Sequence, residues 1–483
     1  MKLKKDNMTK KPRKKLKMIV LILLVVPILI SLLTENPKGT SFTGEYFPAD
    51  NLKFIYDLSF IKDGKQIREH NIINEELDFI AQADSFLILD LFLYNDEYPK
   101  DKMSFPNNVK RITDALIDKK AENPEMPIVL ITDPLNNFYG SYEQKHITRL
   151  KNAGIDVVVT NLDKLKDSNP LLSGYYRCYF RWFSAEGGNW IKNFFDPDAP
   201  KVNVRSILKL ANFKANHRKT LVSEDGAIIS TSNPHDASAN HSNIAVRFTS
   251  NMQNDLIESE KNVAKFSGYS GDAFDYTLFT DVKEDSHYFV SLITEEGIYK
   301  ALLENINEAQ KGDEIDIGIF YISERNILKA LGKASKRGVS VRIVADPNKD
   351  AFGITKNGSP NRDTLHRLVK KYPDIKARWY DTHGEQYHVK TAYFKYNKNS
   401  TVKIVTGSCN YTRRNMRGLN LESNVQILLP ADDKNALEMK NYFDTIFSNT
   451  DGQYTTELEK YPSPSFIKSV LWTIQEYTGL CTW

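Results

Sequence analysis

Two short stretches of the chain carry residue types that suit the chemistry of a phosphate group. In the second of them, His388 and Lys390 stand two apart in a β-prone run, so both side chains leave the same face of a strand. A second strand follows and ends in small and polar residues, Gly407, Ser408 and Asn410. An imidazole, an ammonium, a hydroxyl and an amide thus converge beside the predicted start of a helix at Tyr411. This combination suits the binding of a phosphate.

Residues 217–233 repeat the arrangement in the first half of the chain. His217 and Lys219 again share a strand face, and Asp225–Gly226 is a hairpin turn signal before a return strand. Two further residues take the positions of Ser408 and Asn410, namely Thr231 and Asn233. The two histidines are 171 residues apart and the two asparagines 177, which indicates an internal duplication.

Two imidazoles with paired lysines and asparagines suit phosphodiester chemistry that requires no metal or other cofactor. One imidazole attacks phosphorus and forms a covalent phosphohistidine, while the other protonates the leaving oxygen. The ammonium and amide groups hold the non-bridging oxygens as charge builds, and the hydroxyls assist. We therefore expect catalytic roles for His217, Lys219, His388 and Lys390, and phosphate binding by Thr231, Asn233, Ser408 and Asn410.

The elements around these stretches alternate between helical and strand patterns, and the same order occurs twice. In the first half, the patterns predict helices over 75–83, 109–122 and 142–153 and strands over 86–92, 128–131 and 155–159. In the second half, they predict helices over 297–310, 326–337 and 364–371 and strands over 315–321, 339–344 and 375–380. We predict an α/β protein with two α/β/α layered halves about a pseudo-two-fold axis. The first half would cover residues 45–255 and the second half residues 275–450. A C-terminal amphipathic helix would follow over residues 451–483.

The paired motifs resemble those of the phospholipase D superfamily, whose signature is H-x-K-x-x-x-x-D followed by G-S-x-N, usually twice per chain. The resemblance covers roughly residues 50–450 and also includes the tract T-G-S-C-N-Y-T-R-R-N-M-R-G-L-N-L-E-S-N-V. It implies the phospholipase D-like fold and the two-histidine mechanism. It further implies that Glu422 is the acid that orients the catalytic imidazole.

The chain departs from this signature at several positions. The Asp of the motif falls on Glu224 in the first copy and on Lys395 in the second. The first copy has Ser230–Thr231 in place of Gly-Ser, and Asn243 where the second has Glu422. Because a neutral amide does not offset the charge of an imidazolium, this asymmetry favours His388 as the nucleophile and His217 as the acid. The resemblance implies the opposite alternative, since families of this kind commonly assign the nucleophile to the first copy. Lys395 weakens the case for activity without refuting it.

The N-terminus has the pattern of a membrane anchor. Residues 1–17 carry nine Lys or Arg against one Asp, and residues 18–33 are almost purely apolar. No small-x-small cleavage site follows, so we predict a transmembrane signal anchor over 18–34 rather than a cleaved signal peptide. The run is slightly shorter than the roughly 20 residues that span a bilayer. The positive-inside rule places residues 1–17 in the cytoplasm and the body outside the cell.

Charge and cysteine content bound the function further. The net charge of +4 comes from the N-terminal tail, and the rest of the chain carries 56 basic against 60 acidic residues. A mildly acidic body argues against broad electrostatic binding of nucleic acid. Three widely separated cysteines, Cys178, Cys409 and Cys481, provide neither a disulfide framework nor a metal-ligand spacing.

Two aromatic or apolar stretches fall outside the motifs. The first half carries an insertion of about 40 residues that includes Tyr175 to Phe195, which we expect to form a core or a pocket wall. The alternative is a surface for acyl chains or the membrane interface. We expect the C-terminal helix to pack on the body, with membrane contact as the alternative, through its apolar face of Phe466, Ile467, Val470, Leu471, Ile474 and Tyr477. Four histidines are assigned to surfaces or local hydrogen bonds: His146, His235, His241 and His366.

These features predict a membrane-anchored phosphodiesterase or phosphatidyltransferase, similar to cardiolipin synthases and phospholipases D, with phospholipid and the membrane as its partners. A nuclease of the same superfamily is the first alternative. A catalytically silent binding protein that keeps the fold is the second, and Lys395 and the altered first copy motivate it.

Overall fold

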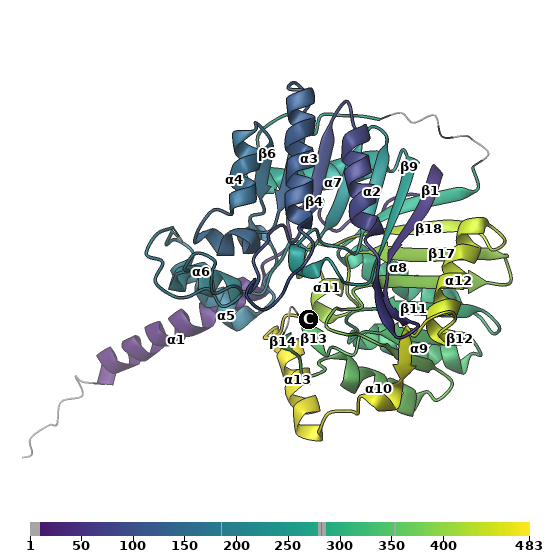
Figure 1. Ribbon diagram of the computed structural model, residues 1–483. Helices are drawn as coiled ribbons and strands as arrows, with labels where there is room; N and C mark the ends of the chain where they lie inside the picture. The colour runs from purple at the N-terminus through teal and green to yellow at the C-terminus, as the bar shows by residue number, and fades with distance from the viewer. Residues whose placement is uncertain (1–9, 185, 279–281, 283–285, 352–353) are drawn as a thin grey trace, which may run out of the picture.

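One continuous sheet runs through both halves of the molecule. The computed structural model describes residues 10–184, 186–278, 282, 286–351 and 354–483. The sheet has fifteen strands in the order β19-β15-β12-β11-β16-β17-β18-β10-β1-β9-β8-β7-β4-β5-β6. In Figure 1, the strands of the first half lie above those of the second half.

The elements of the first half are these: β1 (Phe47–Asp57), β2 (Ser59–Lys62), β3 (Lys65–Arg68), α2 (Asn71–Gln82), β4 (Leu87–Leu91), α3 (Asn108–Glu122), β5 (Ile128–Thr132), α4 (Lys145–Asn152), β6 (Asp156–Val159), α5 (Pro170–Tyr175), a π-helical turn η4 (Tyr176–Phe180), α6 (Val204–Leu210), β7 (Lys219–Ser223), β8 (Gly226–Ser230), β9 (Asn243–Ser250) and α7 (Gln253–Phe266).

The elements of the second half and the C-terminal region are these: β10 (Tyr288–Thr294), α8 (Glu296–Glu308), β11 (Glu314–Ile319), α9 (Arg325–Lys336), β12 (Ser340–Ala345), β13 (Asp350–Ala351), β14 (Ile354–Thr355), α10 (Asn361–Lys371), β15 (Lys376–Tyr380), β16 (Lys390–Tyr396), β17 (Thr401–Gly407), α11 (Arg413–Met416), β18 (Ser423–Pro430), α12 (Lys434–Ser448), β19 (Thr455–Glu457) and α13 (Phe466–Thr478).

The strand order is the same when it is read outward from the middle in either direction. The central strands β1 and β10 pair antiparallel, with Phe47 opposite Val290. Outside them, β9-β8-β7-β4-β5-β6 matches β18-β17-β16-β11-β12-β15 strand for strand, and the last three strands of each series are parallel. One strand without a counterpart, β19, pairs antiparallel with β15 at the edge of the second half. The predicted α/β fold with duplicated halves is therefore confirmed.

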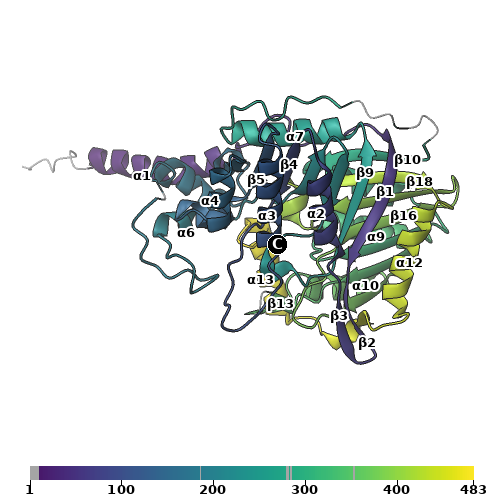
Figure 2. The ribbon, with the colours of Figure 1, turned by 45° about the horizontal axis from the view of Figure 1, so that its top comes forward.

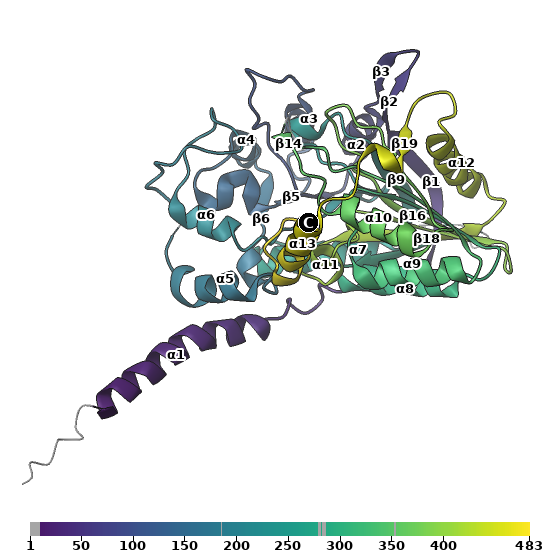
Figure 3. The same ribbon diagram turned by 90° about the horizontal axis from the view of Figure 1, so that it is seen from below.

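Helices cover both faces of the sheet, which explains why strands such as β4 are buried throughout. In the first half, α2, α3 and α4 pack on one face. In the second half, α8, α9 and α10 take the equivalent place, as Figure 3 shows. The single helices α7 and α12 pack on the other face around one core that both halves share. The two halves are thus joined by strand pairing and by a common core.

The C-terminal region differs from the prediction in two respects. It begins with β19, which pairs with β15 and extends the sheet. The helix α13 follows, and its buried residues are Ser469 and Trp472. The apolar face that was expected to pack on the body is exposed instead, at Phe466, Ile467, Val470, Leu471, Ile474 and Tyr477. That expectation is wrong because the more polar face of α13 forms the contacts, including hydrogen bonds from Ser469 to Asp363.

The N-terminal apolar run forms one long helix, α1 (Lys10–Leu32), which projects away from the body in Figures 1 and 2. Its stretch Lys14–Leu32 has a mean hydropathy of 2.5 and is largely exposed, so it is long and apolar enough to cross a membrane. Part of the predicted basic tail, residues 1–9, lies outside the described residues.

Candidate active site

The two motif histidines meet at one cavity of about 300 Å³ between the halves. Each histidine stands two residues before the strand that carries its lysine, β7 or β16. The backbone N–H of His217 donates to the carbonyl of Leu421 at 2.9 Å, and that of His388 donates to the carbonyl of Ser242 at 2.8 Å. The main chain of the opposite half therefore positions each histidine.

The side-chain partners of the histidines also come from the opposite half. His217 Nδ1 lies 3.0 Å from Oε2 of Glu422, and His388 Nδ1 lies 3.0 Å from Oδ1 of Asn243. Asn243 and Glu422 hold equivalent positions, since each follows the residue that receives the histidine N–H. The assignment of Glu422 to His388 is therefore wrong: the chain crosses between the halves, and the carboxylate reaches His217.

The partner of His217 defines the state of its ring. Burial acts to raise the pKa of Glu422, but His217 and Lys219 hold it below its usual value. Burial lowers the pKa of His217 to about 4, against the opposing effect of Glu422. At neutral pH an ionised carboxylate thus faces a neutral imidazole. Because a carboxylate only accepts hydrogen bonds, Nδ1 carries the proton and Nε2 keeps its lone pair.

Within the described part of the chain, His388 makes no ion pair with a carboxylate, and its ring contacts the amide of Asn243 instead. Burial lowers the pKa of His388 well below its usual value, and the nearby Lys390 lowers it further. Asn243 Oδ1 accepts from Nδ1 of His388 and also from the hydroxyl of Thr231 at 2.9 Å. The neutral amide orients this ring without stabilising a positive charge on it. The two histidines are therefore equivalent in position and different in electrostatics.

The two hydroxyls predicted to bind phosphate lie behind the cavity instead. Ser408 and Thr231 are fully buried, and neither is among the residues that line the cavity. The hydroxyl of Ser408 donates to Glu422, as that of Thr231 does to Asn243. Gly407 permits this packing, since its φ is 150° and a Cβ there would lie 2.4 Å from the carbonyl of Ser423. The hydroxyls thus hold the groups that orient the histidines.

The two motif asparagines, by contrast, line the cavity with the histidines. Asn233 and Asn410 both border it, from the ends of β8 and β17 respectively. The backbone N–H of Tyr321 donates to Oδ1 of Asn410 at 3.3 Å. The predicted helix at Tyr411 is only the four-residue α11, so the site does not depend on a helix N-terminus.

The motif lysines are buried beside the histidines. Lys219 Nζ donates to the carbonyl of His217 at 2.6 Å, and Lys390 Nζ donates to that of His388 at 2.7 Å. Burial lowers the pKa of Lys219 to about 7. Burial also lowers the pKa of Lys390 well below its usual value, with a further contribution from Lys219. Two ammonium groups that repel each other in this way favour the arrival of an anion.

An aspartate at the end of a parallel strand binds the backbone directly before each histidine. Asp133 accepts from the backbone N–H of Asn216 at 2.7 Å, and Asp346 accepts from that of Tyr387 at 2.7 Å. Asn216 and Tyr387 are the residues directly before the histidines. Burial raises the pKa of both aspartates to about 7. The repeated Asp-Pro after two equivalent strands was the sequence signal for this pair.

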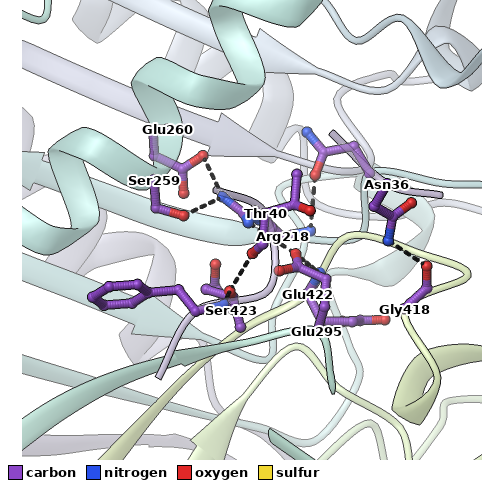
Figure 4. Close-up of polar contacts among 12 residues, drawn as sticks. Asn36, Thr40, Arg218, Ser259, Glu260, Glu295, Gly418, Glu422 and Ser423 are labelled. Carbon is purple, nitrogen blue, oxygen red and sulfur yellow. Dashed lines mark hydrogen bonds and ion pairs between the residues drawn. The ribbon is translucent and has the colours of Figure 1, made fainter. Parts of the chain in front are cut away.

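A buried ion cluster fixes the first motif to the second half. Arg218 is fully buried and contacts Glu260 at 3.1 Å and Glu295 at 2.8 Å, as Figure 4 shows. Oε1 of Glu295 also accepts from the backbone N–H of Glu422 at 3.0 Å. Arg218 is thereby connected through Glu295 to the backbone of Glu422. Removing one member of such a buried group typically costs about 3–5 kcal/mol of stability.

The departures from the motif's Asp lie away from the cavity. Glu224 accepts from the backbone N–H groups of Asp84 at 2.5 Å and Ser85 at 2.7 Å, at the start of β4. Lys395 lies toward the end of β16 that is remote from His388 and pairs with Glu314 at 3.4 Å. Lys395 is therefore not among the residues that line the cavity.

Further residues line the cavity that the motifs did not predict. Three cations border it: Lys214, Lys356 and Arg414. His241, which was assigned to a surface or a local contact, is buried and its ring centroid lies 5.9 Å from that of His388. Much of the remaining wall is apolar, with Phe92, Leu93, Leu135, Tyr139, Phe195, Leu210, Phe213 and Phe320. Among the described residues, no group of three or more His, Cys, Asp or Glu has the arrangement of a metal site.

The chain is similar to several known proteins. The sequence model of the family described as "Cardiolipin synthase, PLD-like domain" matches residues 302–447. The phosphatidylserine synthase of Haemophilus influenzae Rd KW20 has a similar structure, with a TM-score of 0.59 and 10% identity over 90% of this chain and 96% of that one. NucT from Helicobacter pylori matches 33% of this chain and 96% of its own, at 20% identity and a TM-score of 0.26. No curated protein sequence matches the chain.

Proposed function

Because the chain belongs to the phospholipase D superfamily, we propose that it is a membrane-associated phosphodiesterase or phosphatidyltransferase that acts on phospholipids through a phosphohistidine. One observation carries the proposal. His217 and His388 border one cavity, and each has its Nδ1 held by a partner from the opposite half, so that each Nε2 is left for chemistry. Two imidazoles poised in this way suit one nucleophile and one acid.

We assign the nucleophile to His217. Its Nε2 attacks phosphorus, the P–N bond forms, and the P–O bond to the leaving alcohol breaks. The ring then becomes cationic, and Glu422 lies 3.0 Å from its Nδ1 to stabilise that charge. In the fraction of molecules in which His388 is an imidazolium, its Nε2–H supplies the proton that the leaving oxygen takes up. Its amide partner suits this role, because an imidazolium without a carboxylate gives up its proton more readily.

The second step reverses the first with a new alcohol or water. The incoming hydroxyl gives its proton to Nε2 of His388 and forms a P–O bond, while the P–N bond to His217 breaks. Water yields hydrolysis, and an alcohol yields transfer. Asn233 and Asn410, which border the cavity, would hold the non-bridging oxygens in both steps, and Lys219 and Lys390, buried beside the histidines, would add positive charge near them.

The cavity wall and the N-terminal helix support a lipid substrate. A phosphate would meet the cations Lys214, Lys356 and Arg414, while the aromatic and aliphatic wall suits glycerol and acyl carbons. The apolar helix α1 would hold the cavity near a bilayer. The structurally similar protein is a phosphatidylserine synthase, and the matching family is described as cardiolipin synthase. We further propose that the body faces the outside of the cell, because residues 1–17 before the apolar run of α1 are strongly basic.

The test uses the full chain in lipid nanodiscs with chelator present. Phosphatidylglycerol, phosphatidylcholine and single-stranded DNA are offered separately, and wild type is compared with His217→Ala and His388→Ala. We expect release or transfer of the head group by wild type and at least a 10³-fold loss in both variants, as is typical for removal of a catalytic group. Cleavage of DNA without lipid turnover would favour the nuclease alternative. Absence of turnover with all three substrates would favour the silent binding protein.

A further inference from the structure

The helix α1 contacts the body through an aromatic segment, which we define as residues 170–183 and which comprises α5, η4 and the turn after it. Pro27 lies inside α1 and has no N–H, so the carbonyl of Leu23 lacks its usual helical partner. The hydroxyl of Tyr179 donates to this carbonyl at 2.6 Å. A side chain of the aromatic segment thus satisfies the backbone group that the proline frees.

Further contacts continue along α1 on the same side. The hydroxyl of Tyr175 donates to the carbonyl of Leu24 at 2.9 Å. Gly174 allows close packing, because a Cβ at this position would lie 2.4 Å from the carbonyl oxygen of Pro27. Ser31 donates to Asp167 at 2.7 Å in a buried hydrogen bond. The helix and the aromatic segment therefore form one packed unit from Leu23 to Ser31.

The exit of α1 is fixed to both halves of the body. Asn36 accepts from the backbone N–H of Lys166 at 2.7 Å through Oδ1. Its Nδ2 donates to the carbonyl of Gly418 at 2.7 Å, a contact drawn in Figure 4. The connection between the helix and the body is therefore a set of directed contacts on two segments far apart in the sequence.

These contacts determine the depth of the aromatic segment once α1 spans a bilayer. Leu23 is the middle residue of the apolar stretch Lys14–Leu32. At a rise of about 1.5 Å per residue, it lies roughly 14 Å below Leu32. The hydrocarbon core of a bilayer is about 30 Å thick, so half of it is about 15 Å. The hydroxyl of Tyr179 would therefore lie near the middle of the bilayer.

We infer that the aromatic segment is embedded in the leaflet on the side of the catalytic body, beside α1, and that it lets phospholipid of that leaflet enter the cavity directly. The entry of lipid rests on the proposed function, whereas the embedding rests on the contacts with α1. This occupant, the hydrocarbon of one leaflet, explains why large apolar side chains of the segment are exposed: Leu171, Leu172, Tyr179, Phe180, Trp182 and Phe183.

The charged groups of the segment are placed as a lipid environment requires. Arg177 donates to Asp167 at 2.7 and 3.0 Å and to two backbone carbonyls, so its charge is paired. The guanidinium of Arg181 lies 4.2 Å from the ring centroid of Trp182. Paired or aromatic-shielded arginines are the form in which this side chain is tolerated in membranes.

The cavity lies at the level where α1 leaves the bilayer. Asp167 contacts Ser31, one residue before the end of the apolar stretch, and also pairs with Lys214. Lys214 lines the cavity. Phe195, which belongs to the same insertion as the aromatic segment, also lines it. The head groups of a bilayer occupy this level, directly outside the hydrocarbon core. A lipid phosphate would thus reach His217 while its acyl chains remain in the leaflet.

The first test measures embedding by fluorescence quenching in the full-length protein. The protein is reconstituted into nanodiscs whose lipids carry bromine along the acyl chains, and Trp182→Phe is compared with Trp472→Phe. Trp182 is 70% exposed in the segment, whereas Trp472 is a buried residue of α13. We expect bromolipid to quench a component that is lost in Trp182→Phe and kept in Trp472→Phe. Equal quenching in both variants would overturn the embedding.

The second test measures lipid entry with the double variant Trp182→Ser, Phe183→Ser. We expect kcat/KM for phospholipid in the bilayer to fall at least tenfold, and hydrolysis of water-soluble bis(p-nitrophenyl) phosphate to stay within about twofold of wild type. An unchanged rate on bilayer lipid would overturn direct entry. If wild type hydrolyses neither substrate, the proposed function fails, while the quenching result still decides the embedding.

Discussion

Replacing Glu422 by Gln tests the assignment of roles to the two histidines. The change keeps the size of the side chain and a hydrogen-bond acceptor for His217 Nδ1, but removes the negative charge 3.0 Å from that nitrogen. Two unit charges about 4 Å apart interact by about 4 kcal/mol at an effective dielectric constant of about 20. This energy corresponds to a factor of about 10³ in rate. Because the hydrogen bond persists, we expect a loss of about 10²- to 10³-fold in formation of the phosphohistidine.

The pH dependence of kcat/KM provides a second and independent test of Glu422→Gln. His217 must be neutral to attack, so kcat/KM rises with pH through the pKa of its imidazole, which is about 4. Glu422 acts to raise that pKa, so its loss lowers the pKa and moves the acid limb to lower pH. The alkaline limb, which reports loss of the proton that His388 donates, should move much less.

The assay is the burst of p-nitrophenol from bis(p-nitrophenyl) phosphate, followed across the pH range in which the fold is retained. The matched control is Glu314→Gln, which removes a carboxylate from the same half at a position that pairs with Lys395 and Lys440. The control should keep its burst rate within about twofold. A burst rate for Glu422→Gln within about threefold of wild type would refute the assignment of Glu422 to the nucleophile.

Four further predictions follow from the same structure. Asn243→Asp gives His388 a carboxylate partner, which raises its pKa, so the alkaline limb of kcat/KM should move up by about one to three pH units; an unmoved limb would speak against His388 as the acid. Ser408→Ala removes a donor to Glu422 and should lower kcat about tenfold without changing KM, whereas a rise in KM would place the hydroxyl on the phosphate. Lys395→Ala should leave kcat and KM unchanged, because Lys395 pairs with Glu314 away from the cavity; a loss of more than about fivefold in steady-state assays would contradict this. Burial raises the pKa of Glu76 to about 8, so the folded protein keeps a proton that the unfolded chain releases, and stability falls as pH rises from about 5 to about 8. Denaturant unfolding of Glu76→Gln should show a flatter dependence, by up to about 1.4 kcal/mol per pH unit, and a slope equal to that of wild type would exclude Glu76 as its source.

The elements that the sequence predicts well are those whose signal is local. The strands β5 and β12 end directly before Asp133 and Asp346, and α9 has a clear helical period. The strand β1, in contrast, contains Pro48, Asp50 and Asn51 and has a register shift between Asp50 and Lys53. It is a strand because β9 and β10 pair with its two edges, and no local pattern carries that information.

The sequence predicted which residues border the cavity, but not which of the site residues contact one another. The spacing of the motifs identifies both histidines and both asparagines that border the cavity. It does not say that Glu422 crosses to His217, because each half offers a residue at an equivalent position, Asn243 in the first and Glu422 in the second. Only the pairing of Leu421 with the backbone of the opposite half settles this. For the same reason, the inference that made His388 the nucleophile rested on the wrong partner.

The remaining differences between prediction and structure concern which residues are buried and what packs against them. The period of α13 identifies its apolar side, but periodicity does not say what packs against it, and the body contacts the other side through Trp472. No sequence spacing relates His241 to the motifs, so its position at the cavity was not predicted. The insertion that includes Tyr175 to Phe195 was expected to form a core or pocket wall. In the structure, Phe195 lines the cavity, while Trp182 and Phe183 are exposed.

The central claim is that His217 carries the phosphoryl group and His388 moves the proton. The most direct measurement is to quench the full-length enzyme during turnover of a phosphodiester and to map the modified residue by mass spectrometry. His388→Asn is included because it should slow breakdown of the intermediate and so increase its yield. We predict a phosphoryl adduct on His217 in both proteins and none on His388 in wild type. An adduct on His388 in wild type, or an adduct that persists in His217→Asn, would contradict the account.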